Sequence, residues 1–194
     1  MVHRVLIVGH SFIHRLKSFQ FQNRRSGWYN LGFDGTEIQV QFAGLGGGTL
    51  RPGPKSIQSE RFMQVFHSYQ PNSVFLQIGE NDLCREENVE KLARDIRSFA
   101  EFLLVAHNVS HVIVGQLLPR YSDGINPRYN VKVIEANKQL TTLFKDRDNI
   151  SFWKRRGLWK NTESLLTDKV HLNDDGMRIY AKSIRAAVGS FKRR

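Results

Sequence analysis

Cysteine is nearly absent from this chain of 194 residues, which contains Cys84 alone. One cysteine forms neither a disulfide within the chain nor a cysteine-rich metal cluster, so we expect no metal and no other cofactor. The lack of a disulfide framework favours a reducing compartment, and the expected location is therefore intracellular, cytoplasmic or nuclear. Cys84 itself is expected to be a small buried side chain.

Long apolar runs are also missing. Those that occur, such as VLIV (5–8) and FLLVA (102–106), are far shorter than the roughly 20 residues that cross a membrane as a helix. The first residues, MVHRVLIVGHSF, run directly into a strand pattern and lack the small-residue cleavage site of a signal peptide. We therefore expect no transmembrane segment.

Acidic residues are in the minority, since 18 Asp and Glu stand against 29 Lys and Arg and leave a net charge of +11. The excess basic residues form clusters. Such clusters suit an anionic partner such as nucleic acid or acidic lipid, although a solvated surface without a partner explains them equally well. The basic residues gather at Arg24 and Arg25, at Lys154, Arg155 and Arg156 with Lys160, and at Lys192, Arg193 and Arg194.

What the chain does contain is a regular alternation of strand and helix patterns. Apolar and β-branched runs predict five strands, at 3–9, 36–44, 73–79, 111–118 and 149–154. Amphipathic patterns predict helices at 59–70, 87–108, 128–146 and from 174 onward, and Val133, Ile134 and Leu140 belong to the apolar stripe of the third. Apolar strands separated by helices predict a parallel sheet covered on both faces, an α/β/α sandwich in one domain over 1–194.

Sites in such folds form at the carboxyl ends of the strands. The first three strands are followed by Gly9-His10-Ser11, by the glycine loop 43–49 and by Gly79-Glu80-Asn81-Asp82. Far downstream, Asp168 precedes His171 by three residues at the start of the last helix. This set would supply a nucleophile in Ser11, a base in His171, an acid that orients it in Asp168, and oxyanion donors in Gly47 and Asn81.

Each motif also has a purely structural interpretation. Ser11 could be the N-cap of a helix, the glycine loop a turn or a phosphate cradle, and Asp168 with His171 a surface pair. The glycine loop lacks the lysine of a Walker loop, and the serine lacks the second glycine of a G-x-S-x-G elbow.

Four blocks in this order resemble the SGNH hydrolases, the GDSL-type esterases and lipases. They are VGHS, AGLGGGT, QIGEND and DKVHLNDDG, and the resemblance extends from residue 4 to about residue 190. It implies a flavodoxin-like sandwich with five parallel strands and metal-independent hydrolysis of acetyl and other short acyl esters of small molecules, lipids or carbohydrates. It also implies Ser11 as nucleophile, Asp168 and His171 as acid and base, and an oxyanion hole made by the Ser11 and Gly47 N–H groups and the Asn81 side chain.

The chain departs from the family pattern at two positions. His10 stands where the family usually has an aspartate before the serine, and Phe42 stands where the glycine block often begins with asparagine. His10 is expected to reshape the loop at the nucleophile. A thiol mechanism that pairs Cys84 with His171 is a much less favoured alternative.

Loop residues around the site predict a pocket with positive charge at its rim. The residues expected there are His10, Arg51, Arg120, Tyr121 and Arg128. An anionic ester would suit them. The main alternative function is an idle hydrolase-like domain, as in a retroelement-encoded protein, whose basic surface binds nucleic acid or a protein partner. No nucleic-acid-binding motif supports that alternative.

Overall fold

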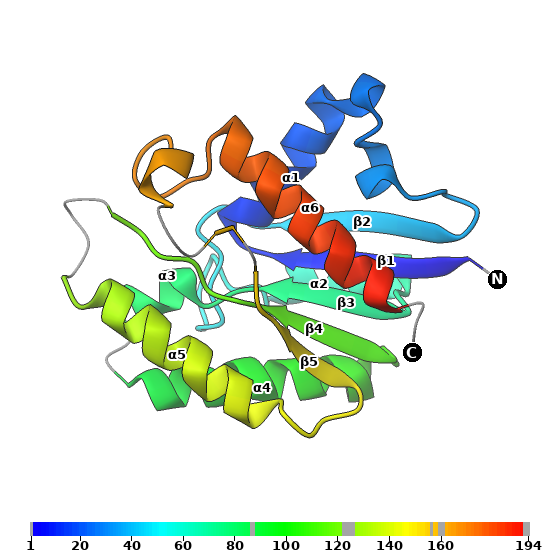
Figure 1. The fold of residues 1–194 in the computed structure, drawn as a ribbon. Coiled ribbons are helices and arrows are strands. Elements are labelled where there is room, and N and C mark those ends of the chain that lie inside the picture. The colour runs from blue at the N-terminus through cyan, green and yellow to red at the C-terminus, as the bar shows by residue number, and fades with distance from the viewer. Residues whose placement is uncertain (1, 86–87, 122–126, 156, 159–161, 192–194) are drawn as a thin grey trace.

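The computed structural model describes residues 2–85, 88–121, 127–155, 157–158 and 162–191. Its centre is a parallel sheet with the strand order β2-β1-β3-β4-β5 (Figure 1). The strands are β1 (His3–Gly9), β2 (Ile38–Gly44), β3 (Ser73–Gln77), β4 (His111–Gly115) and β5 (Ile150–Trp153). All five predicted strands are confirmed, and the last four are somewhat shorter than predicted.

Helices cover both faces of the sheet, so the fold is the expected three-layer α/β/α sandwich (Figure 1). On one face lie α1 (Ser11–Gln22) and α6 (Asp174–Ser190), and on the other lie α2 (Glu60–Tyr69), α4 (Val89–Ala106) and α5 (Tyr129–Leu143). Short elements are α3 (Glu80–Leu83) and the 3-10 turns Arg24–Ser26, Tyr29–Gly32 and Glu163–Leu165. Among the helices of the described residues, none is long and apolar enough to cross a membrane.

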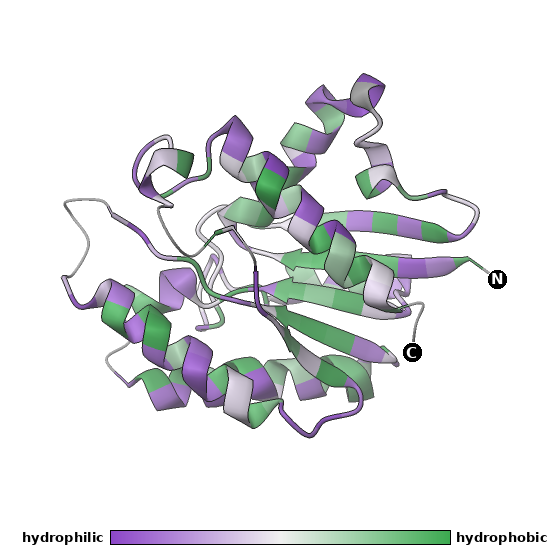
Figure 2. Cartoon of the chain, viewed as in Figure 1, coloured by the Kyte–Doolittle hydropathy of each residue, from purple (hydrophilic) through white to green (hydrophobic). Residues whose placement is uncertain are grey.

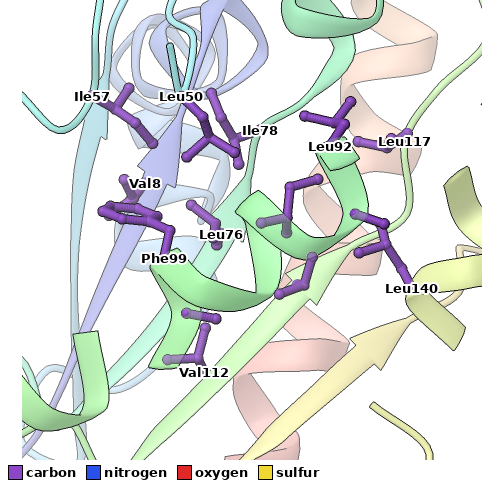
Figure 3. Close-up of a cluster of buried hydrophobic side chains, with 14 of the residues drawn as sticks. Val8, Leu50, Ile57, Leu76, Ile78, Leu92, Phe99, Val112, Leu117 and Leu140 are labelled. Atoms are coloured by element: carbon purple, nitrogen blue, oxygen red, sulfur yellow. The ribbon is translucent and has the colours of Figure 1, made fainter. Parts of the chain in front are cut away.

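The alternation of side chains along each strand divides the core into two clusters. Val5 and Ile7 of β1 pack toward α1 and α6, whereas Leu6 and Val8 pack toward α2, α4 and α5. Figure 3 shows residues of the second cluster, among them Val8 and Leu76 of the sheet and Phe99 of α4. The inner strands β1, β3 and β4 are buried and apolar along most of their length, whereas the edge strands β2 and β5 are partly exposed and β2 alternates apolar and polar residues (Figure 2).

Two expectations about burial were wrong in α5 and in the segment after β5. Ile134 of α5 is 57% exposed, because the side chain of its neighbour Val133 points toward the core and is fully buried. Arg155, expected in a basic surface cluster, is 4% exposed. Its cluster partners Arg156 and Lys160, like the terminal Lys192, Arg193 and Arg194, lie outside the described residues.

The strand order places a crevice between β1 and β3. From β1 the chain moves to β2 on one side, then returns past β1 to β3 and continues outward to β5. The connections after β1 and β3 therefore leave the sheet in opposite directions, and open α/β sheets bind their ligands at such a point. Ser11 follows β1 and Asn81 follows β3, so both predicted site residues belong to this crevice.

Candidate active site

Ser11 is the first residue of α1 and follows the tight junction between β1 and the helix. Gly9 ends the strand, and a Cβ at this position would overlap the carbonyl oxygen of Gln77 on β3. The His10 N–H donates to that same oxygen over 3.2 Å. The N-cap of α1 is His10, whose Nδ1 accepts from the Phe12 N–H at 3.5 Å, so the capping role considered for Ser11 belongs to its neighbour. Ser11 instead presents one of the first N–H groups of the helix, which have no partner inside it.

His10 was expected at the pocket rim, but it is entirely buried. Its Nε2 lies 2.7 Å from Oε2 of Glu80, which is also fully buried. Its Nδ1 lies 3.4 Å from the Ser11 hydroxyl. The imidazole therefore joins the predicted nucleophile to a carboxylate at the end of β3. This pairing is the physical reason that a histidine is accommodated at a buried position.

Glu80 is the centre of a buried polar network. Its Oε1 accepts from the Gln77 side-chain amide and from the Leu118 N–H at 3.3 Å. Burial alone would raise the pKa of Glu80, but the contact with His10 and the charge of Arg120 outweigh it and hold the pKa below its ordinary value.

Arg155 extends the network from β5. Its guanidinium donates to the Gln77 side-chain oxygen and, over 2.6 Å, to the Gln116 carbonyl oxygen. The Tyr180 ring of α6 lies 4.6 Å from the guanidinium carbon. Burial lowers the pKa of Arg155, with the charges of Tyr180 and Glu80 acting in the opposite sense. The cationic side chain of Arg155 thus connects the segment after β5 with Gln77 of β3.

The glycine loop is held against the end of β1. The Leu45 N–H donates to the Gly9 carbonyl oxygen over 2.9 Å, and Gly47 has a φ of +71°, which favours glycine. The buried carboxylate of Asp82 accepts from the N–H groups of Leu50 and Arg51, at 3.0 Å and 3.3 Å. Burial raises the pKa of Asp82 although these hydrogen bonds act to lower it.

The amide of Asn81 is held from two sides. Its Nδ2 donates to the Gly48 carbonyl oxygen over 2.9 Å, which ties it to the glycine loop. Its Oδ1 accepts from Nη2 of Arg120 at 2.8 Å. Because an amide nitrogen carries two hydrogens, the hydrogen bond to Gly48 uses one of the two N–H groups of Asn81.

Arg120, predicted at the pocket rim, is 7% exposed. It is buried because it bridges three groups: the Asn81 oxygen, the Cys84 sulfur at 3.3 Å, and the Tyr129 ring, whose centroid lies 5.4 Å from the guanidinium carbon. Cys84 is exposed, which contradicts the expectation of a buried thiol. It is exposed because it follows the short helix α3 at the mouth of the crevice.

Asp168 and His171 form a hydrogen-bonded pair at the other side of the crevice. Oδ2 of Asp168 lies 2.7 Å from Nδ1 of His171, and Oδ1 accepts from the N–H groups of His171 and Val170, at 2.6 Å and 3.1 Å. The little burial that Asp168 has would raise its pKa, but these hydrogen bonds hold it well below the usual range. The carboxylate therefore stays ionised and orients the imidazole.

The loop that carries this pair is fixed by backbone contacts. The Thr167 N–H donates to the His171 carbonyl oxygen over 2.8 Å, and Lys169 takes a φ of +59° between them. The α6 helix starts just afterwards, where the Asn173 side chain accepts from the Gly176 N–H at 3.0 Å and Asp174 and Asp175 occupy the first turn. Figure 1 shows this loop beside the first turn of α1.

The His171 ring packs edge-on against Phe12, with 6.3 Å between ring centroids. Phe12 is the residue directly after Ser11, so the predicted base lies against the turn that holds the predicted nucleophile. Glycine loop, Asn81, Ser11 and the Asp168–His171 pair thus gather at the same edge of the sheet. Within the described residues, no group of three or more His, Cys, Asp or Glu side chains is arranged to hold a metal ion.

A cavity of about 530 Å³ adjoins the glycine loop and Asn81. Arg51 lines it, as expected of a rim residue. Tyr121 is half-buried, with its hydroxyl 3.0 Å from Oγ1 of Thr162, and Arg128 is exposed just before α5. Residues 122–126, between these two predicted rim residues, lie outside the described residues. Phe42, the second departure, is half-buried against the cluster of α1 and α6.

The sequence interpretation missed the buried network of Glu80, Gln77 and Arg155. It also missed Lys55, whose side chain lies against Gly47. Glu80 had a signal, because it stands beside Asn81 in the block GEND. The other three residues contact partners in other segments of the chain or across a loop, and no local sequence pattern indicates such contacts.

Comparison with known proteins gives one family model, described as GDSL-like Lipase/Acylhydrolase, which matches residues 9–184. No curated protein matches the sequence. Among solved structures, a GDSL-like lipase from Bacteroides thetaiotaomicron is similar with a TM-score of 0.66 and 19% identity, over 96% of this chain and 88% of that one.

Two further structures have the same fold. A psychrotrophic esterase from Pseudoalteromonas gives a TM-score of 0.68 at 15% identity, over 99% of this chain and 100% of that one. A catalytic mutant of an acetylxylan esterase from Geobacillus stearothermophilus gives 0.60 at 13%, over 96% and 94%. At these identities the likeness concerns the fold alone.

Proposed function

The chain belongs to the GDSL-like lipase/acylhydrolase family and is a carboxylic ester hydrolase, and we propose that it hydrolyses short-chain, acetyl-type esters with Ser11 as nucleophile. The observation that carries the proposal is the pair of Asp168 and His171, which places an oriented imidazole against the turn of Ser11. A serine is a weak nucleophile until such a base accepts its proton.

The reaction starts when His171 takes the proton of the Ser11 hydroxyl and the serine oxygen attacks the ester carbonyl. Because Nδ1 of His171 is hydrogen-bonded to Asp168, Nε2 is the nitrogen left to accept that proton. The ionised Asp168 then stabilises the imidazolium. His171 returns the proton to the leaving alcohol, and afterwards it activates a water that hydrolyses the acyl-serine.

Negative charge develops on the carbonyl oxygen in both steps. The donors we assign to it are the N–H groups of Ser11 and Gly47 and the free N–H of Asn81. The hydrogen bonds of Asn81 with Gly48 and Arg120 fix its amide before substrate binds. Donors held in place beforehand need no reorganisation during the reaction, which is the source of their effect.

The cavity beside the oxyanion donors favours a short acyl group. Its described lining is made of glycine, proline, threonine, asparagine, basic residues and Cys84, and it includes no leucine, isoleucine, valine, methionine or aromatic side chain for a long chain to pack against. A long acyl chain would have to lie against polar groups, at the cost of their hydration.

The test is hydrolysis of 4-nitrophenyl acetate, butyrate and octanoate by the wild type, Ser11→Ala, His171→Ala and Cys84→Ser. We expect turnover that decreases with chain length, is lost in the first two variants and is kept in the third. Circular dichroism establishes that the variants are folded. Covalent labelling of Ser11 by an alkyl phosphonate, detected by mass spectrometry, gives an independent readout. Activity that survives in folded Ser11→Ala would overturn the proposal, and activity lost in Cys84→Ser alone would indicate the thiol mechanism.

The alternative function, an idle site with a nucleic-acid-binding surface, predicts a different pattern. Binding to an oligonucleotide would fall steeply with salt and would be unchanged in Ser11→Ala. Measuring that binding for the same set of proteins separates the two functions.

A further inference from the structure

The cavity beside the oxyanion donors has an unusual lining. It is formed by two segments, 47–55, which begins in the glycine loop and continues beyond it, and 81–85 around α3. The cavity shares Gly47 and Asn81 with the proposed oxyanion hole, so a molecule that fills it lies next to the reacting carbonyl.

Three cationic side chains line this cavity, Arg51, Lys55 and Arg85, and no acidic side chain does so among the described residues. Asp82 lies buried behind the loop, where it accepts from the Arg51 N–H and faces its charge. Part of the charge of Arg51 is thereby balanced. Lys55 and Arg85 make no ion pair with a described residue.

Lys55 lies against Gly47, one of the proposed oxyanion donors. Its Nζ lies 3.1 Å from the point where a Cβ on Gly47 would lie, so the ammonium group covers the glycine that is a proposed oxyanion donor. A long side chain in this position does not fill an apolar gap, because Lys55 is exposed.

The backbone that presents Lys55 is held in place by hydrogen bonds. The Thr49 N–H donates to the Lys55 carbonyl oxygen over 2.9 Å, and the Ile57 N–H donates to the Thr49 carbonyl oxygen over 2.9 Å. Ile57 is fully buried and anchors the returning strand of the loop in the core. The base of the lysine is thus fixed by the fold, and only its side chain is free to adjust.

We propose that the natural substrate is an ester that carries an anionic group, a carboxylate or a phosphate, which binds Lys55 and Arg85 in this cavity while the ester carbonyl occupies the oxyanion hole. The inference rests on the proposed function, because it assigns a substrate class to the same site. It adds that positive charge beside the carbonyl selects substrates in addition to stabilising the oxyanion.

Two matched substrate pairs test the proposal on either side of the ester bond. The first is 4-acetoxyphenyl phosphate with its dimethyl phosphate ester, where the charge lies on the alcohol. The second is the 4-nitrophenyl monoester of adipic acid with its methyl ester, where the charge lies on the acyl group. Each pair is assayed with the wild type, Lys55→Gln and Lys145→Gln. Lys145 is exposed just after α5, at the opposite end of the sheet, and its change removes the same charge.

In at least one pair, we expect the wild type to prefer the anionic member, measured as kcat/KM. Lys55→Gln should reduce that preference by about fivefold, the effect of one partly exposed ion pair, and Lys145→Gln should leave it unchanged. Using the ratio within a pair removes any effect of Lys55 on the oxyanion itself. The preference should also shrink as ionic strength rises from about 0.05 M to about 0.5 M.

The outcomes separate the two proposals. If Ser11-dependent hydrolysis is present and the anionic members have no advantage that depends on Lys55, the substrate assignment is wrong and the serine esterase stands. If no ester is hydrolysed faster by the wild type than by Ser11→Ala, both are wrong. An equal loss in Lys145→Gln would show an effect of net charge only, which also overturns the assignment.

Discussion

Nε2 of His10 lies 2.7 Å from Oε2 of Glu80, with both side chains completely buried. The family usually has an aspartate at the position of His10, and in this chain a buried carboxylate lies beside that position because Glu80, the first residue of α3, supplies it. His10 then occupies the space between that carboxylate and Ser11. The histidine at the family's aspartate position is therefore paired with a buried carboxylate from a distant segment of the chain.

This pairing predicts that restoring the family aspartate alone is harmful. His10→Asp would place a second carboxylate near Glu80 in a buried site without a cationic partner between them, and we expect a loss of about 3 kcal/mol in the free energy of unfolding. Adding Glu80→Gln removes one of the charges and should recover a large part of the loss. Urea denaturation of the wild type, both single variants and the double variant measures the coupling. Additive effects of the two changes would contradict the pairing.

The lowered pKa of Glu80 predicts a specific pH dependence of stability. The folded state holds the proton of Glu80 less tightly than the unfolded chain does, so its carboxylate stabilises the fold above the ordinary pKa of 4.5. This contribution is lost as the pH falls through the lower folded pKa.

Wild type and Glu80→Gln should therefore differ most in their free energy of unfolding at about pH 7 and progressively less below about pH 4. Denaturation series at several pH values provide the measurement. A difference that stays constant, or grows toward acid pH, would rule out the stated direction of the shift.

Arg120 is predicted to act through Asn81. Arg120→Met removes the hydrogen bond that holds the Asn81 oxygen, and we expect kcat to fall about 10- to 100-fold, less than the loss of the donor itself in Asn81→Ala. KM should change little, because Arg120 is buried behind the site. The decisive comparison is the same change made in an Asn81→Ala background. There Arg120→Met should have almost no effect on kcat, and a full effect would assign Arg120 another role.

Asp168→Asn is predicted to separate loop structure from orientation of the base. The asparagine oxygen still accepts from the N–H groups of Val170 and His171, so the loop should keep its conformation. Its amide cannot stabilise the imidazolium, and kcat should fall by up to about 10⁴-fold. Since Asp168 is half-exposed, the melting temperature should change little. A large fall in melting temperature with kcat preserved would assign the pair a structural role only.

The sequence was informative where function depends on local patterns. The five strands, the start of α6 at Asp174 and the strand-end positions of Ser11 and Asn81 follow from short apolar runs and the residues after them. These features depend on neighbours in the chain, and a periodic pattern records neighbours well.

The sequence was uninformative where side chains from distant segments meet. Arg155 appears as one residue of a basic cluster, but Gln77 and Gln116 from other strands draw it into the core. The four residues of α3 are too few for a periodic signal, so the exposure of Cys84 at its end was missed. The contact of the Lys55 side chain with Gly47 exists only in the folded loop, and the spacing of the two residues in the sequence does not predict it.

The contrast between the two halves of the site has a consequence for refolding. Asp168 and His171 are hydrogen-bonded within three residues of sequence, so this pair can form as soon as its loop does. Bringing the pair to Ser11 requires the C-terminal helix to dock on α1, a contact between opposite ends of the chain. Such long-range contacts form late because closing a long loop costs entropy. Recovery of hydrolysis after dilution from urea should accordingly lag behind recovery of the helical circular dichroism signal. The length of this lag would measure how slowly the last helix docks on α1.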